Sequence, residues 1–250
     1  MDDVEREKEL AGNLKRVRNR IAEAVRMAGR SEEPELIVVT KYFPASDVRL
    51  LAGMGVSEFG ENRDQEAGPK AAELEDLNPT WHFIGQLQGN KAKSVVRYAR
   101  AVQSVDRQSL VSSLARAMEN EQLRRASVGQ SSRERLDCYL QVNLDPHNDE
   151  APQGSGRGGA RPEDLQGLAD VVAQSPWLVL AGVMAVAPVR DDAAAAFDRL
   201  RGISDNLTLS YPSATAISAG MSADLEQAVA AGATHLRIGS DVLGARATVR

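Results

Sequence analysis

The feature that most constrains the fold is a regular alternation of short apolar runs with amphipathic stretches along nearly the whole chain. An amphipathic helix carrying Leu10, Leu14, Val17, Ile21 and Val25 comes first. Eight strand-like runs follow, at 36–40, 56–60, 81–85, 101–105, 136–142, 178–183, 214–217 and 234–238. Strands separated by helices form parallel sheets in which consecutive strands are neighbours. Eight such units predict a single α/β domain, a (β/α)8 TIM barrel with an extra N-terminal helix.

The length agrees with one barrel over residues 1–250, because this fold typically needs about 250 residues. One segment, 146–162, is rich in Gly, Pro, Asp and Ser and has no periodicity. Since the alternation of strands and helices resumes after it, we expect a flexible loop inside the domain rather than a domain boundary.

Composition excludes several classes of function. The net charge is −5 and the basic residues are dispersed among carboxylates, whereas nucleic-acid binding needs clustered positive charge. The single Cys138 lies in an apolar run and predicts a buried packing residue, and no histidine has ligand spacing for a metal. The charged N-terminus and the absence of an apolar run of about 20 residues predict a cytoplasmic protein without a membrane segment.

Lys41 ends the most apolar of the early strands, 36–40, which reads as buried on both faces. One explanation is an ordinary lysine whose amine reaches solvent at the strand end, and for this segment alone it is the commoner one. The other is a nucleophilic amine for a carbonyl substrate or for pyridoxal phosphate (PLP). Both remain open at this point.

In a barrel all strands end at one mouth, so residues distant in sequence converge there. The candidates at these strand ends are Lys41, Asn62, His82, Gln86, Asn90, Arg237 and Ser240. His82 is also compatible with a packed, hydrogen-bonded imidazole in the core, which is the interpretation we favour. Ser218, Gly220 and Ser222 after the seventh strand, with Gly239-Ser240 after the eighth, offer small residues that suit a phosphate group.

Arg237 lies near the end of the eighth strand, as an ion-paired packing residue or as a donor facing the mouth. A guanidinium stays charged, so beside a pyridine nitrogen it donates a hydrogen bond and leaves that nitrogen unprotonated. An unprotonated ring is a poorer electron sink, which suits binding or restricted racemase chemistry.

Seven segments, taken in order, resemble the pyridoxal-phosphate homeostasis proteins, single-domain relatives of the alanine racemase N-terminal barrel. They are VTKYFPASDV, FGENRDQEA, WHFIGQLQGNKAKSV, SVDR, GVMAVAP, SAGMSADLEQAVAAGATHLRIGS and VLGAR. The chain departs from the family at Tyr42-Phe43, where Thr-Lys is frequent, at Ala219, and in the loop after the fifth strand, where Arg157 replaces a Lys-Ser-Gly element.

The resemblance implies a PLP-binding protein that holds the cofactor as an internal aldimine on Lys41 and contributes to intracellular PLP homeostasis, with PLP-dependent apoenzymes as possible recipients. It implies Asn62 near the ring and Arg237 near the pyridine nitrogen. The implied cofactor-binding set is Lys41, Asn62, Ser218, Gly220, Met221, Ser222, Arg237, Ile238, Gly239 and Ser240. We expect a monomer or a weak dimer.

Two other functions are compatible with these residues. A weak PLP-dependent amino-acid racemase needs a second acid/base group opposite the lysine, and only Tyr42 among the tyrosines lies near the expected mouth. We therefore expect a carrier rather than an enzyme. A sugar-phosphate aldolase using Lys41 without PLP is the third hypothesis.

Overall fold

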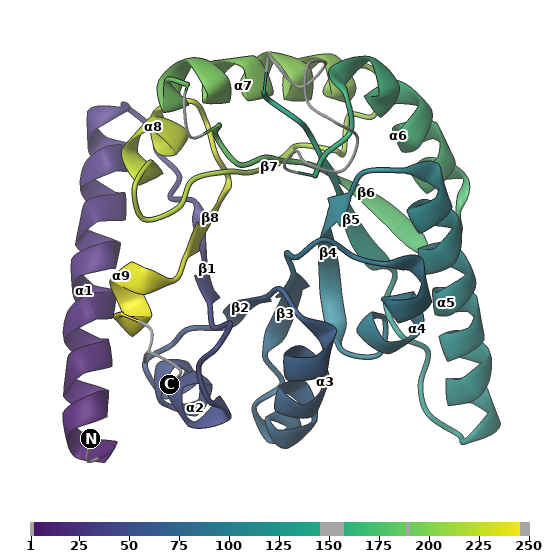
Figure 1. The fold of residues 1–250 in the computed structure, drawn as a ribbon, viewed down its shortest axis with the longest axis horizontal. Coiled ribbons are helices and arrows are strands. Elements are labelled where there is room, and N and C mark those ends of the chain that lie inside the picture. Colours follow the sequence, from purple (N-terminus) through teal and green to yellow (C-terminus); the bar gives the residue numbers. More distant parts are fainter. Residues whose placement is uncertain (1–2, 146–157, 189–190, 246–250) are drawn as a thin grey trace.

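The computed structural model describes residues 3–145, 158–188 and 191–245. Within them eight parallel strands form a closed barrel in the order β1-β2-β3-β4-β5-β6-β7-β8, with each strand paired to its sequence neighbours and β8 paired to β1. Figure 1 shows the helices as an outer ring around these strands. The predicted (β/α)8 barrel is confirmed.

The strands have the following bounds: β1 Glu35–Val39, β2 Glu58–Glu61, β3 Thr80–Phe83, β4 Ala99–Val105, β5 Leu136–Gln141, β6 Leu178–Met184, β7 Ala216–Ser218 and β8 His235–Ile238. The α-helices are α1 Asp3–Met27, α2 Ala45–Gly53, α3 Asp64–Glu73, α4 Ala92–Val95, α5 Gln108–Ser127, α6 Leu165–Gln174, α7 Ala193–Ser210, α8 Leu225–Ala230 and α9 Ser240–Leu243. Short 3-10 turns lie at Glu75–Leu77, Gly89–Lys91 and Pro162–Asp164.

The extra N-terminal helix α1 covers the outside of the barrel beside α8 and α9 (Figure 1). It buries one stripe of side chains, which includes all five apolar residues that predicted it, Leu10, Leu14, Val17, Ile21 and Val25. Apolar residues three and four apart in sequence lie on one helical face, so the stripe packs inward while charged residues face solvent.

The sequence after Lys91 predicts a helix to about Arg100, but α4 ends at Val95, and Arg100 already lies in β4. Pairing of Ala99 with Trp81 in β3 extends the sheet and takes these residues from the helix. The short helix α9 after β8 was not predicted.

The segment 146–162, expected to be a flexible loop, falls largely outside the described residues, which resume at 158. From there the chain is held against the end of β5. The N–H of Ala160 donates to the carbonyl oxygen of Gln141 at 2.7 Å, and the N–H of Asn143 donates to the oxygen of Ala160 at 2.9 Å. Cys138 is fully buried, as expected for a packing residue.

No helix within the described ranges is long and apolar enough to cross a bilayer. The same ranges contain no group of three His, Cys, Asp or Glu side chains placed to hold a metal ion.

Candidate functional site

Lys41 lies just beyond the carboxyl end of β1, at the mouth of the barrel. Thr40 still belongs to the sheet, because its N–H donates to the carbonyl oxygen of Gly60 at 3.0 Å. The chain then turns: the N–H of Phe43 donates to the oxygen of Thr40 at 3.0 Å, and Tyr42 adopts a left-handed backbone with φ of 69°. Lys41 is half-buried between buried Thr40 and exposed Tyr42. The turn fixes its backbone while leaving part of the residue accessible.

A buried ion pair supports this turn from below. The ammonium of Lys70 in α3 pairs with the carboxylate of Glu61 and donates to the backbone oxygen of Thr40 at 3.0 Å. The hydroxyl of Thr40 donates to the same carboxylate at 2.7 Å. Burial raises the pKa of Glu61, and the positive charge of Lys70 opposes this rise. The residue preceding Lys41 is therefore held by both its backbone and its side chain.

The ends of β7 and β8 meet on the adjacent side of the mouth. The hydroxyls of Ser222 and Ser240 lie 3.2 Å apart, although 18 residues separate them. Gly220 has φ of +89°, and a Cβ there would lie 2.6 Å from the Cβ of Ala228, so only glycine fits without strain. We call Ser222, Gly239 and Ser240 the serine cradle. Its two hydroxyls and its small residues suit an anionic oxygen.

Helix α1 braces this serine cradle through Arg20. Its guanidinium donates to the backbone oxygen of Ser222 at 3.1 Å, to Asp241 at 2.6 Å, and to Glu226 at 2.9 Å. One side chain thus ties the loop after β7, the first turn of α9 and helix α8 to the N-terminal helix.

Arg237 is buried inside the barrel, next to the serine cradle in sequence and below it in depth. Its side chain donates to the hydroxyl of Ser218 at 2.7 Å and to the backbone oxygen of Ala185 at 2.8 Å. The backbone N–H of Arg237 donates to the backbone oxygen of Gly220 at 3.0 Å. Burial lowers the pKa of Arg237 to about 10, so the guanidinium remains charged at neutral pH. The alternative prediction is an ion-paired packing residue; Arg237 is packed, but the acceptors of its side chain, Ser218 and Ala185, are both uncharged.

Asn62 follows β2, the strand next to β1, and lines a cavity of about 430 Å3 with Arg63, Gln86, Lys91 and Arg107. Its side-chain oxygen is buried without a hydrogen-bond partner among the described residues. A buried acceptor without a hydrogen-bond partner is costly. The side-chain oxygen of Asn62 is therefore a candidate acceptor for a donor group of a ligand.

Three other predicted site residues, Ser218, Ile238 and Met221, differ in their burial and contacts. Ser218 is fully buried, and its hydroxyl donates to Gln103 at 2.7 Å as well as accepting from Arg237. Ile238 is buried in β8. Met221 is partly exposed, and its N–H donates to the carboxylate of Asp224 at 2.6 Å.

His82 does not belong to the mouth, where strand position had placed it as one candidate. Its ring bonds to Glu58 at 2.6 Å and to Gln103 at 3.0 Å, and it lines a cavity of about 670 Å3 at the opposite end of the barrel, which we call the floor cavity. The favoured interpretation as a packed, hydrogen-bonded core imidazole is confirmed. Gln103 and Arg20 were missed, because no local motif marks them.

Lys41, Arg237 and the serine cradle lie at the mouth of one barrel, and the chain matches the class of proteins that contain the alanine racemase N-terminal domain. The family model described as the N-terminal domain of alanine racemase matches residues 12–247. Alanine racemase from Corynebacterium glutamicum, at 14% identity, has a TM-score of 0.59; the match covers 94% of this chain and 60% of that enzyme, and it shows likeness of fold alone.

Nearer relatives narrow this class. The pyridoxal phosphate homeostasis protein of Mycobacterium tuberculosis is 39% identical over 258 residues, covering 97% of this chain and 95% of the relative. PipY of Synechococcus elongatus, solved with PLP bound, is 32% identical with a TM-score of 0.75, and the match covers 94% of this chain and 100% of that one. The chain therefore belongs to the pyridoxal phosphate homeostasis protein family.

Proposed function

We propose that this protein binds PLP, holds it covalently through Lys41 and serves the cell as a PLP carrier. One observation carries the proposal. Strands β1 and β8 are paired with Val38 opposite Ile238, so Lys41 and the Gly239-Ser240 pair leave adjacent strands at the same mouth. A Cβ at Gly239 would lie 3.3 Å from the backbone oxygen of Val39, which shows how closely the two strand ends approach.

The residues at the mouth fit the chemistry of the cofactor. PLP supplies an aldehyde that condenses with a primary amine, a pyridine ring and a phosphate. Lys41 offers the amine, and the serine cradle offers hydroxyl and N–H donors for the phosphate. Arg237 is buried and charged, and its guanidinium would donate to the ring nitrogen. Asn62 follows the neighbouring strand β2 and would face the ring. Gly220, Met221 and Ile238 would form the backbone wall of the site. The hydroxyl of Ser218 accepts a hydrogen bond from Arg237 and so helps to hold its guanidinium.

A carrier role is favoured over an enzyme by the placement of the tyrosines, the residue type that would serve as a second acid/base group. The hydroxyl of Tyr139 lies 3.2 Å from His235 deep in the barrel, and that of Tyr98 donates to Asp64 at 3.4 Å. Burial raises the pKa of both phenols. Tyr211 bonds to Asp170. Tyr42 is exposed beside Lys41 and carries the guanidinium of Arg63 at 5.0 Å from its ring centre.

The homeostasis role rests on the name shared by the bacterial relatives, such as that of M. tuberculosis. Such a carrier would act in the cytoplasm, as a monomer or weak dimer, and pass PLP to apoenzymes that need it. Amino-acid racemase activity is the second candidate, because the same fold occurs in alanine racemase.

Absorbance of the freshly purified protein tests the proposal. The parent should show the band of a PLP–lysine adduct, and Lys41→Ala should lose it. The exposed Lys93→Ala is the matched control and should keep it. A parent that takes up no PLP, or a Lys41→Ala protein with an unchanged band, contradicts the proposal. Rapid exchange of the α-proton of alanine in deuterated water would favour the racemase instead.

A further inference from the structure

A continuous row of side-chain hydrogen bonds crosses the interior of the barrel from the mouth to the floor cavity. Arg237 Nη1 lies 2.7 Å from Ser218 Oγ, which lies 2.7 Å from Gln103 Oε1. Gln103 Nε2 lies 3.0 Å from His82 Nδ1, and His82 Nε2 lies 2.6 Å from Glu58 Oε2. We call these five residues the interior relay.

The donors of the interior relay all point in one direction. Arg237 can only donate, so Ser218 Oγ accepts from it and turns its own hydrogen to the amide oxygen of Gln103. The amide nitrogen of Gln103 also only donates, so His82 Nδ1 accepts. The N–H of His82 is then at Nε2, and it donates a hydrogen bond to the carboxylate of Glu58. The bond dipoles align from guanidinium to carboxylate, and aligned bonds strengthen one another in a buried environment.

The sheet is locally distorted around the centre of the interior relay. The β3–β4 register shifts between Trp81 and His82, and the β4–β5 register shifts between Val102 and Val105, on either side of Gln103. Such irregularities redirect side chains and occur next to functional sites. Gln103 is fully buried, and so are both of its partners, His82 at 4% and Ser218 at 0% exposure. The buried amide of Gln103 is held at both ends, by Ser218 and by His82.

Arg237 needs such support because its two side-chain acceptors, the hydroxyl of Ser218 and the carbonyl of Ala185, are both uncharged. A buried guanidinium without a bonded carboxylate is costly, and its orientation depends on the uncharged acceptors that hold it. The interior relay connects it to Glu58, a carboxylate at the far end of the barrel. It also holds Nη1, so that the remaining N–H groups are aimed by the geometry of the side chain.

We propose that Gln103, His82 and Glu58 are positioning residues for the cofactor: acting through Ser218, they hold the guanidinium of Arg237 in the orientation that meets the ring nitrogen of PLP. This inference rests on the proposed function. It means that residues at and near the floor cavity influence PLP binding at the mouth, although none of the three would contact the cofactor.

The first test compares two neighbouring buried residues of β4. Gln103→Met keeps the side-chain volume and removes both of its hydrogen bonds, whereas Ser104→Ala removes a hydroxyl that has no partner among the described residues. Gln103→Met should weaken PLP binding about tenfold, the order expected for a charged hydrogen-bond network. It should also shift the absorbance maximum of the bound cofactor, which responds to hydrogen bonding at the ring nitrogen. Ser104→Ala should do neither.

The second test uses isosteric changes in the floor cavity, which leave folding least affected. Glu58→Gln removes the charge that His82 bonds to, and Glu35→Gln removes a charge from the same cavity without touching the interior relay. Glu58→Gln should shift the absorbance maximum in the same direction as Gln103→Met and weaken PLP binding about threefold. Glu35→Gln should match the parent.

The outcomes separate this inference from the proposed function. A parent without bound PLP refutes the proposed function itself. A parent that binds PLP while Gln103→Met behaves like Ser104→Ala, or Glu58→Gln like Glu35→Gln, overturns the interior relay. Thermal unfolding of each variant distinguishes loss of fold from loss of positioning, because a merely structural role lowers the melting temperature without moving the absorbance maximum. If Gln103→Met does not fold, the floor-cavity pair decides alone.

Discussion

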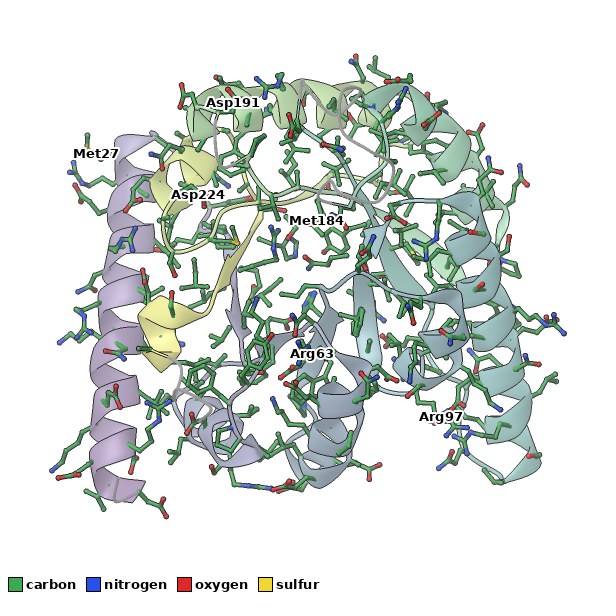
Figure 2. The ribbon with its side chains drawn as sticks, viewed as in Figure 1. Met27, Arg63, Arg97, Met184, Asp191 and Asp224 are labelled. Carbon is green, nitrogen blue, oxygen red and sulfur yellow. The ribbon has the colours of Figure 1, made fainter. Side chains whose placement is uncertain are left out.

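The inside of the barrel and the layer outside it are built from different side chains. The outer layer, between strands and helices, is filled with Leu, Val, Ile, Ala and Phe, including fully buried Leu114 and Phe197. The inside holds a small apolar cluster, Ala101, Tyr139 and Met184, together with the hydrogen-bonded side chains of the interior relay. Figure 2 shows Met184 within the ring of strands and Met27 on α1, at the outer edge of the molecule.

The difference teaches that stability and binding are located in separate regions of one small domain. Apolar burial in the outer layer stabilises the fold, at roughly 25 cal/mol per Å2. Buried polar groups contribute little net stability, but they hold one orientation when every hydrogen bond is made. Changes in the outer layer should therefore alter unfolding more than ligand binding, and changes inside the barrel should do the reverse.

The largest effect is expected from Phe197→Ala in the outer layer. Phe197 is buried in α7, and loss of its ring should lower the free energy of unfolding by about 3–5 kcal/mol. Urea denaturation measures this change. Leu209→Ala on the same helix is the control, since Leu209 is 83% exposed and should cost less than about 0.5 kcal/mol. The folded fraction should keep its PLP affinity; a large loss of affinity would break the division between the two regions.

Lys70→Met should cost nearly as much, about 3 kcal/mol, because it leaves the buried carboxylate of Glu61 without its cation. The Lys70–Glu61 ion pair is a polar contact that stabilises the fold, so this variant tests whether stability depends on apolar burial alone. The exposed Lys93→Met serves as the matched control. Adding Glu61→Gln to Lys70→Met should recover part of the loss in urea denaturation, and a double variant no more stable than the single one would refute the ion-pair explanation.

Inside the barrel, His235 should make the free energy of unfolding depend on pH. Burial, with a smaller effect of nearby His82, lowers the pKa of His235 from 6.5 to about 4. The unfolded chain therefore binds this proton more readily, and stability should fall as pH drops from about 6.5 to about 4, by about 3 kcal/mol in total. Below about 4 the contribution of His235 levels off.

His235→Gln isolates this contribution from the carboxyl groups that titrate in the same range. The difference between parent and variant stabilities, measured by urea denaturation at several pH values, should shrink or change sign as pH falls through the window. Curves that stay parallel from neutral pH to pH 4 would show that His235 does not titrate as its burial demands.

The smallest effect on stability is expected at the border of the two regions, where Arg20 braces the serine cradle from α1. Its ion pairs are partly exposed, so Arg20→Ala should cost no more than about 1 kcal/mol. PLP affinity should nevertheless fall a few fold, because the loops carrying Ser222 and Ser240 lose a shared anchor. Arg26→Ala, on the same helix and paired with neighbouring Glu23, is the control. Equal PLP affinity in both variants would refute the bracing role.

Much of the architecture follows from local patterns. The stripe from Leu10 to Val25 predicts α1, and the apolar runs predict all eight strands, because burial on one or both faces leaves a period in the sequence. The mouth residues on β1 and β8 also follow, since parallel strands in a barrel end at one side. The helix expected to reach Arg100 failed, because strand pairing, which has no local signature, outweighed helix propensity there.

The sequence by itself determined the barrel, the place of Lys41 at its mouth and the small residues of the serine cradle, because each depends on neighbours a few residues apart. Only the tertiary structure decided that Ser218 serves Arg237 and Gln103, which is 115 residues away, and that His82 faces the floor cavity. Which side chains meet inside a closed barrel depends on strand stagger and on the irregularities beside Gln103, and these arise only when all eight strands pair.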